Sequence, residues 1–194
     1  YQWDSRGFTA KSAYDLLQRP VSVRITGNGI DQLTEQLVYG ESEADPKNRN
    51  LRGRLIRHYD QAGIASVNLY GIQGNVREKT RRLRTEYQTE ANWNDIPSVP
   101  LDGDIFTTTI VYDALGRISR RTNADGSVQK PQYHISGRLN AVQVILQGES
   151  KPTTIVQSID YNARSQRSKI IYGNGIKTTY EYEPTTFRMT ALLT

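Results

Sequence analysis

The fold is decided by Tyr112-Asp113-Ala114-Leu115-Gly116-Arg117-Ile118, because degraded copies of this stretch recur along the whole chain. Two clear copies are Tyr14-Asp15-Leu16-Leu17-Gln18-Arg19, which lacks the glycine, and Tyr59-Asp60-Gln61-Ala62-Gly63-Ile64, which lacks the arginine. Weaker copies begin at Trp3, Tyr70, Tyr133, Tyr161 and Tyr182. Tyrosines recur 21 residues apart (Tyr112 to Tyr133, Tyr161 to Tyr182) and 11 apart (Tyr59 to Tyr70, Tyr161 to Tyr172). A fixed period that contains its own half-period indicates a repeat array.

Each copy predicts a strand, a tight turn and a second strand. The tyrosine ends a β-prone run, the aspartate can bond the backbone of the turn, and the glycine supplies a positive φ. Asp125-Gly126 adds a strong hairpin signal within the same block. A half-period of about 10 residues is one short strand plus one turn. The sequence therefore predicts an all-β chain, an antiparallel array of β-hairpin repeats with very little helix.

Two segments interrupt the period, residues 41–50 and residues 88–104, and the second contains Pro97, Pro100 and Asp102-Gly103. We expect a first repeat block over residues 1–87, a linker or insertion over 88–104 and a second repeat block over 105–194. The two blocks should form one continuous repeat sheet. The chain opens within a repeat, at Tyr1, and we expect it to be a fragment of a larger protein.

The composition favours a thin sheet. Hydrophobic residues make up only 36% of the 194 residues. In the predicted strand over residues 76–87, neither alternate set of side chains is apolar enough to lie against a packed core along its whole length. We therefore expect a sheet that is solvated on both faces over part of its area.

The residues that usually carry catalysis or bind metals are scarce. There is no cysteine, and the two histidines, His58 and His134, each stand beside a repeat tyrosine with no carboxylate or second ligand at metal-ligand spacing. The count allows a Ser-His-Asp triad, but no nucleophile-elbow motif frames a serine. The aspartates Asp15, Asp60 and Asp113 recur at one place in the turn, and turn formation explains them. We predict no catalytic residue, no cofactor, no metal and no enzymatic activity.

Basic residues are most dense at Lys79, Arg81, Arg82 and Arg84, in a chain of formal net charge +5. On a strand this run divides between two faces, so we interpret it as a solvated strand face and expect no nucleic-acid binding. The arginines of the repeats, such as Arg117 and Arg138, should pair with aspartates or stack on tyrosines of the adjacent hairpin. No stretch is long and apolar enough for membrane insertion.

The frame Tyr-Asp-x-x-Gly-Arg followed by Ile or Leu resembles the YD repeat of Rhs proteins over nearly the whole chain. Residues 50–60 and residues 167–192, with Tyr172-Gly173-Asn174-Gly175 and Tyr180-Glu181-Tyr182-Glu183-Pro184, are similar to the B component of bacterial insecticidal Tc toxin complexes. The resemblance implies a secreted, extracellular complex and a role as a structural segment of a hollow shell. Its partners would be the remainder of that shell, a C-type component with its toxic polypeptide, and indirectly a pore-forming A-type component. The self-cleaving aspartates of Rhs proteins follow the repeats, and nothing here matches their motif.

The residues that carry the repeat signature are expected to be structural. They are Tyr14, Asp15, Tyr59, Asp60, Gly63, Tyr70, Gly74, Tyr112, Asp113, Gly116, Arg117, Tyr133, Gly137, Arg138, Tyr161 and Tyr182. We expect the rings of Tyr112 and Tyr133 to pack against a neighbouring repeat, in a ladder of cross-strand aromatic contacts.

An alternative function is that of a carbohydrate-binding module of a secreted or surface repeat protein, because aromatic hairpin repeats of about 20 residues also bind sugars. Only two tryptophans, Trp3 and Trp93, are present, which favours stacking between hairpins over sugar binding. The first and last strands, near residues 8–14 and 188–193, should have unpaired backbone groups that recruit another chain. The alternative is that these two strands pair with each other and close a small barrel.

Overall fold

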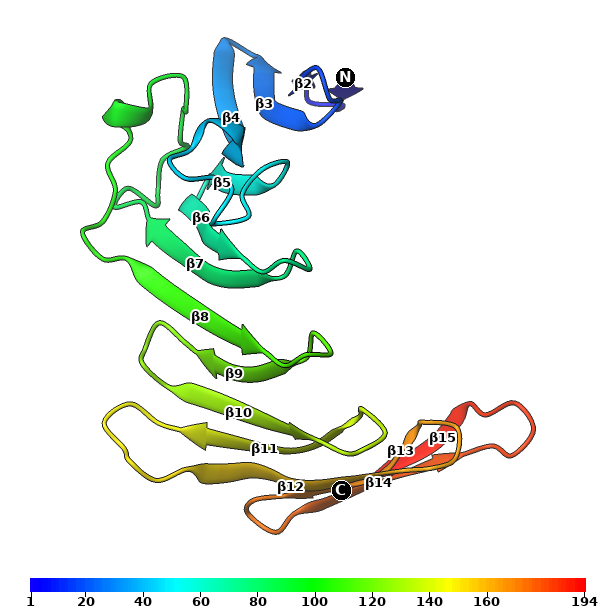
Figure 1. The fold of residues 1–194 in the computed structure, drawn as a ribbon. Helices are drawn as coiled ribbons and strands as arrows, with labels where there is room; N and C mark the ends of the chain where they lie inside the picture. Colours follow the sequence, from blue (N-terminus) through cyan, green and yellow to red (C-terminus); the bar gives the residue numbers. More distant parts are fainter. The chain divides into compact units, whose positions relative to one another are not determined.

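The computed structural model describes all residues, 1–194, and consists almost wholly of β-strands (Figure 1). Helix is limited to two short 3-10 turns, η1 (Gly40–Ser42) and η2 (Ile96–Ser98). The strands are β1 (Gln2–Trp3), β2 (Thr9–Tyr14), β3 (Pro20–Gly27), β4 (Ile30–Tyr39), β5 (Leu55–Asp60), β6 (Gly63–Tyr70), β7 (Val76–Leu83), β8 (Phe106–Tyr112), β9 (Ile118–Thr122), β10 (Val128–Tyr133), β11 (Leu139–Ile145), β12 (Thr153–Tyr161), β13 (Arg167–Tyr172), β14 (Lys177–Tyr182) and β15 (Met189–Leu193). The all-β prediction is confirmed.

The chain forms two compact units, residues 1–109 and residues 110–194. Within each unit the strands follow one another in chain order, and the paired neighbours are antiparallel, as in a succession of hairpins (Figure 1). β8 lies at the division, and its first four residues, 106–109, pair with β7 in the first unit. The predicted hairpin array is the architecture of both units.

The tyrosines of the repeats end even-numbered strands, except Tyr59, which lies in β5. Tyr14, Tyr39, Tyr70, Tyr112, Tyr133, Tyr161 and Tyr182 are the last residues of β2, β4, β6, β8, β10, β12 and β14. We call the connections that follow these strands the repeat turns. Because neighbouring strands are antiparallel, the repeat turns of one unit all lie at the same end of its strands, and the intervening connections lie at the other end.

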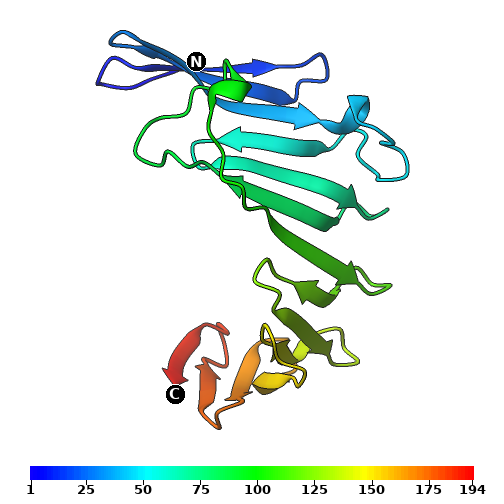
Figure 2. The ribbon, with the colours of Figure 1, turned by 90° about the vertical axis from the view of Figure 1, so that its left-hand side faces the viewer.

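One face of the sheet in the first unit is covered by the segment between β7 and β8. Trp93, Ala91 and Val99 of that segment are buried against Tyr59 of β5, with Leu33 of β4 packed alongside. The segment runs beside the strands of this unit in Figure 2. Trp93 is only 1% exposed. Residues 88–104 therefore supply part of the hydrophobic core of this unit.

A second cluster lies under the connection between β4 and β5, where Leu51 is completely buried against Ile56 and Tyr70. The second unit has no comparable insertion. Its most buried apolar residues, including Ile159 and Ile170, are scattered over the strands. This fits the expectation of a thin sheet with partly solvated faces.

Candidate functional site: the repeat turns

The repeat turn after Tyr112 is organised by the side chain of Asp113. Its Oδ1 accepts hydrogen bonds from the backbone N–H groups of Leu115 and Arg117, each at 2.9 Å, and its Oδ2 accepts one from Arg117 Nε at 2.7 Å. The backbone closes the turn with Gly116 N–H bonded to the Asp113 carbonyl at 3.0 Å. Gly116 has φ +75°, a conformation that costs other residues about 1–2 kcal/mol. The turn chemistry predicted for aspartate and glycine is thus present.

Asp15 forms the same turn at the start of the chain. Its carboxylate accepts bonds from the N–H groups of Leu17 at 2.8 Å and Arg19 at 2.9 Å, and from Arg19 Nε at 2.7 Å. The backbone N–H of Arg117 lowers the pKa of Asp113, and that of Arg19 lowers the pKa of Asp15. These carboxylates are held ionised by their donors, which is the opposite of what a general acid needs.

The arginine of the turn after Tyr112 reaches the tyrosine of the next repeat. The guanidinium carbon of Arg117 lies 4.5 Å from the ring centroid of Tyr133. The Tyr133 hydroxyl donates to the carbonyl of Ile118, the residue after that arginine, at 3.0 Å. We call this arrangement of arginine, tyrosine ring and following carbonyl the Arg–Tyr step. It joins one hairpin to the next through a cation–π contact and a hydrogen bond.

The Arg–Tyr step recurs through both units. The other complete examples are Arg19 with Tyr39 (4.0 Å) and Pro20 C=O (3.0 Å), Arg54 with Tyr70 (5.0 Å) and Leu55 C=O (2.6 Å), and Arg138 with Tyr161 (5.4 Å) and Leu139 C=O (2.8 Å). The expected pairing of Arg117 and Arg138 with aspartate or tyrosine is confirmed. The expected contact of Tyr133 with other aromatic rings is wrong, because a guanidinium takes that place beside its ring.

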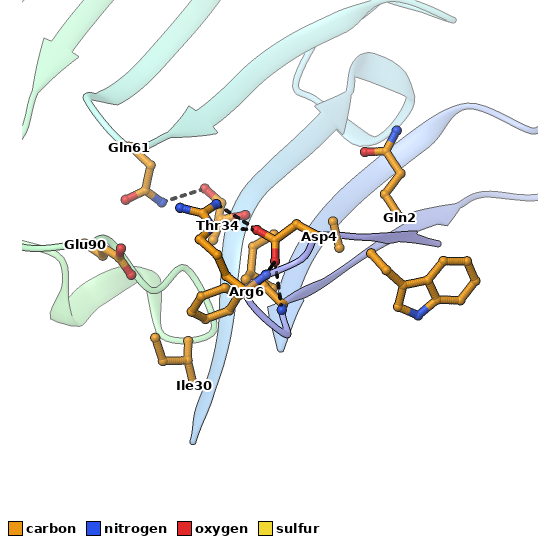
Figure 3. A pocket seen from close by; sticks show the side chains of 11 residues that line it. Gln2, Asp4, Arg6, Ile30, Thr34, Gln61 and Glu90 are labelled. Carbon is orange, nitrogen blue, oxygen red and sulfur yellow. Dashed lines mark hydrogen bonds and ion pairs between the residues drawn. The ribbon is translucent and has the colours of Figure 1, made fainter. Parts of the chain in front are cut away.

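A pocket of about 590 Å³ lies in the first unit, beside the turn between β1 and β2 (Figure 3). Asp4 and Arg6 in its wall form an ion pair at 2.7 Å. Gln61 donates to the Thr34 carbonyl at 3.0 Å, and Glu90 is the remaining ionised side chain of the lining. The pocket has neither a histidine nor a pair of free carboxylates, so its residues do not form a recognisable acid–base or nucleophilic site.

Comparison with known proteins identifies the source of this repeat. No family model matches the chain. Toxin subunits YenC2 and YenC1 of Yersinia entomophaga are 33% and 32% identical to it, over 91% and 84% of its residues. The crystal structure of TcdB2–TccC3 superposes on 96% of the chain with a TM-score of 0.86 and 30% identity. A Photorhabdus luminescens Tc holotoxin pore gives the same values. The chain belongs to the Rhs/YD-repeat components of Tc toxin complexes.

The similarity covers most of this chain but a small part of its relatives. The chain spans about a fifth of the length of the two toxin subunits, 19% and 17%, and 9% of TcdB2–TccC3. The relatives carry the letter C in their names, whereas the sequence motifs resemble the B component. The chain is therefore a stretch of YD repeats from a Tc toxin component.

In two YD repeats another residue, asparagine or histidine, takes the place of the turn aspartate. In the turn after Tyr161, Asn162 Oδ1 accepts the N–H groups of Arg164 and Gln166 at 3.0 Å, and Asn162 Nδ2 donates to Gln166 Oε1 at 2.9 Å. Ser165, at the glycine position, has φ +73°. After Tyr133, the aspartate position is His134, whose Nδ1 accepts the N–H of Ser136 at 3.2 Å. The shape of the YD turn therefore forms without the aspartate charge.

The YD repeat at Asp60 has no arginine four residues later and takes one from another strand. Arg81 of β7 holds the Asp60 carboxylate with two bonds of 2.6 and 2.8 Å. Burial raises the pKa of Asp60, but the bonds from Arg81 and from the N–H of Ala62 outweigh it, so the pKa is lowered overall. Gly63 approaches β7 so closely that a Cβ there would overlap the Arg82 carbonyl oxygen. This pairing depends on strand register, which the repeat motif alone does not reveal.

Several polar residues have partners that the sequence analysis missed. His58 Nε2 lies 3.0 Å from Glu35 Oε2 of the adjoining strand, a carboxylate partner that the spacing in the sequence did not reveal. No group of three or more potential metal ligands surrounds it.

The basic run on β7 is also more than a solvated face. Arg81 binds Asp60, Arg82 donates to the Asp102 carbonyl at 2.6 Å, and Arg84 is buried with Nη1 bonded to the carbonyls of Gln61 and Thr89. Arg82 and Arg84 hold the segment after β7 in place, and Arg81 joins β7 to Asp60 of β5. The interpretation as a solvated face is wrong for these three arginines.

The outermost signature residues differ from the inner ones. Tyr182 donates to the Arg167 carbonyl at 2.9 Å, with Gln166 in place of the arginine. Tyr14 is 58% exposed at the end of β2.

Neither 3-10 turn is of a length or composition that could cross a membrane.

Proposed function

We propose that this chain is a stretch of the β-sheet wall of an Rhs-type shell that encloses a toxic polypeptide for delivery by a toxin complex. In this role the turns and strands supply geometry, and no residue carries out bond chemistry. The observation that carries the proposal is the Arg–Tyr step, in which the polar side chains of one YD repeat are used to hold the next. A surface whose functional groups bind one another is suited to containment.

The proposed partners follow from the family. They are the remainder of the same shell, the complementary component with its toxic cargo and, through these, a pore-forming A-type component. The motifs favour the B component with a C-type partner, whereas the names YenC1 and YenC2 favour the reverse assignment. The segment has the same role in either component, within a secreted, extracellular toxin complex.

The carbohydrate-binding alternative is less well supported by the geometry. A sugar stacks on the open face of an aromatic ring, but Tyr39, Tyr70, Tyr133 and Tyr161 each have a guanidinium over the ring and a hydroxyl bound to a carbonyl. A glycan array with the isolated chain tests this alternative. Saturable sugar binding that is lost in Tyr133→Ala but retained in Tyr87→Ala would favour it.

The shell proposal is tested by placing this chain in TcdB2–TccC3 instead of the matching segment. The proposal predicts that the chimera assembles and protects an enclosed polypeptide from added protease. Breaking a step with Arg117→Gln and Tyr133→Phe together should increase cleavage of that polypeptide, whereas the control Tyr87→Phe, at an exposed tyrosine outside the steps, should not. An assembled chimera whose interior is fully open to protease would contradict the proposal.

A further inference from the structure

The repeat turn after Tyr70 has a glycine, Gly71, at the position of the turn aspartate. Its backbone is closed by the same two bonds as the turn after Tyr112. The N–H of Gly71 donates to the Asn75 carbonyl at 2.8 Å, and the N–H of Gly74 donates to the Gly71 carbonyl at 2.9 Å. The main chain thus forms a YD turn that has no carboxylate of its own.

Two backbone N–H groups of this turn are left without an acceptor, those of Gln73 and Asn75. Their counterparts in the turn after Tyr112, at Leu115 and Arg117, both donate to the turn aspartate. In every other repeat turn a side chain accepts a backbone N–H. Backbone N–H groups that converge on one place form a binding site for an anion.

Two arginines without a carboxylate partner lie against the same turn. The Arg54 guanidinium packs on Gly74, where an added Cβ would overlap its Nη1, and covers the Tyr70 ring at 5.0 Å. The stem of Arg77 passes Gly71, with its Cδ 3.6 Å from the place of an added Cβ. Neither arginine takes part in an ion pair of the chain. Their charge is therefore available to an anion at the turn.

A hollow of about 240 Å³ beside the turn adds to the positive charge. It is lined by Pro46, Lys47, Asn50, Arg52 and Arg54. Asn50 joins the hollow to the turn, because its Nδ2 donates to the Tyr70 carbonyl at 3.0 Å. Lys47 and Arg52 are exposed, and the lining has no acidic residue.

We propose that the turn after Tyr70 binds an acidic side chain, aspartate or glutamate, of another polypeptide. One oxygen of that carboxylate accepts the N–H groups of Gln73 and Asn75, and Arg54 and Arg77 are its counterions. The side chain of Asn75, which lies over Gly71 and makes no hydrogen bond of its own, turns aside to admit it.

A carboxylate is the anion that these groups match. In the turns after Tyr14 and Tyr112, a single carboxylate oxygen accepts the equivalent pair of N–H groups at 2.8–2.9 Å, and the second oxygen accepts an arginine. The turn after Tyr70 offers the same donors to a group from outside. Lys47 and Arg52 favour a segment in which a further acidic residue is near the first.

NMR spectra that resolve each backbone amide test the proposal, with N-acetyl-aspartate amide as the probe at constant ionic strength. The amide signals of Gln73 and Asn75 should shift until they saturate at tens of millimolar probe. Those of Leu115 and Arg117 should not shift, because the turn aspartate already occupies them. The uncharged N-acetyl-asparagine amide should shift neither pair.

Supplying the carboxylate within the chain should close the site. In Gly71→Asp the new Cβ meets only the end of the Asn75 side chain, which can move, and the probe should no longer bind. The matched control is Gly103→Asp, which adds the same charge at an exposed glycine with open space around it. That variant should bind the probe like wild type.

The cations of the hollow are tested in the same titration. Lys47→Gln together with Arg52→Gln should weaken binding of the probe about threefold, as expected for two solvated charges. Arg120→Gln together with Lys151→Gln removes the same charge at exposed positions outside the site and should leave the affinity unchanged. The unperturbed amide signals of each variant establish that it is folded.

Four outcomes would overturn the proposal. The amides of Gln73 and Asn75 do not respond to the probe, or those of Leu115 and Arg117 respond equally. Gly71→Asp binds the probe as tightly as wild type. The two pairs of charge-removing substitutions weaken binding equally. Inorganic phosphate saturates the same amides at a lower concentration than the aspartate probe, which would make the turn a phosphate site. None of these outcomes bears on the shell proposal, which concerns the complete steps.

Discussion

At the scale of single residues, one carboxylate accepts the side-chain hydrogen bonds that organise a YD turn. Asp113 binds two backbone N–H groups and the Arg117 side chain, and this fixes the guanidinium above Tyr133. The ion pair is solvated, and pairs of this kind contribute little to stability. Its contribution lies in the position of the arginine, and Asn162 shows that the turn itself forms without the charge.

The positive φ of the turn predicts opposite results for substitutions at two equivalent positions. Gly116→Ala should lower the free energy of unfolding by about 1 kcal/mol, because φ is +75° there. Gln18 occupies the same place in the Asp15 turn with φ +62°, so Gln18→Gly should leave stability unchanged or raise it. Urea denaturation of both variants checks this. Equal destabilisation by the two changes would show that backbone strain is not what glycine relieves here.

The turn carboxylates predict a loss of stability in acid. The pKa values of Asp15 and Asp113 are lowered by backbone N–H groups, and the N–H of Thr186 lowers the pKa of Glu183 to about 2. A carboxylate whose pKa is lower in the folded chain than in the unfolded chain stabilises the fold above the unfolded pKa, near 4. That stability is lost as the pH falls through the folded value.

Melting temperatures measured from pH 7 to pH 2 check this expectation. They should be level down to about pH 5 and then fall. In Asp113→Asn, which keeps the Oδ1 acceptor but cannot titrate, the fall should be smaller. A melting temperature that rises on acidification would contradict the assignment of these carboxylates.

At the scale of elements, the segment between β7 and β8 is a core element of the first unit. Trp93 contacts Tyr59 edge to face, with centroids 5.1 Å apart, and donates to the Asp60 carbonyl at 3.2 Å. Trp93→Ala should therefore cost about 3–5 kcal/mol. The matched control is Trp3→Ala at a side chain that is 77% exposed, which should cost less than about 0.5 kcal/mol. Similar costs for the two changes in urea denaturation would mean that this segment does not stabilise the sheet.

The neutral turn after Tyr161 predicts that a complete step can be built by substitution. Asn162→Asp together with Gln166→Arg should restore the ion pair and place a guanidinium near Tyr182, whose hydroxyl already binds the Arg167 carbonyl. The melting temperature of the double variant should exceed that of wild type. The increase should also be larger than the sum of the changes in melting temperature that the two single variants show. A double variant that is no more stable than Gln166→Arg alone would show that the aspartate does not position the arginine.

The sequence predicted the elements whose signals are local. The frame at Tyr112 located the turns, because the aspartate, the glycine and the arginine act within five residues. The tyrosine spacing likewise located the hairpins. The contacts that the sequence did not predict depend on strand register or on packing between residues far apart in the chain. Arg81 meets Asp60 and Glu35 meets His58 only after strands have paired.

The segment over residues 88–104 has no local sequence signal for its place in the core. Ala91, Trp93 and Val99 are separated by polar residues and prolines with no strand or helix period, so nothing local showed that they are buried. The aromatic contact expected at Tyr133 was wrong for a different reason. The sequence showed that the repeat arginines could stack on tyrosines. At Tyr133 the guanidinium of Arg117 covers the ring, so a second aromatic ring cannot take that position.

At the scale of the whole molecule, each hairpin is held mainly by the hairpins beside it. In such arrays each repeat contacts only its neighbours, and stability depends mainly on these nearest-neighbour contacts. The central claim of this account is that the Arg–Tyr step is one of those contacts. Loss of one step should therefore loosen the strands it joins and leave distant strands unchanged.

Hydrogen–deuterium exchange of the chain with Arg117→Gln and Tyr133→Phe together tests this claim most directly. The account predicts faster amide exchange in β9 and β10, over residues 118–122 and 128–133, and unchanged exchange in β2 to β4. Exchange that stays as slow as wild type in β9 and β10, or that rises equally in β2 to β4, would contradict it.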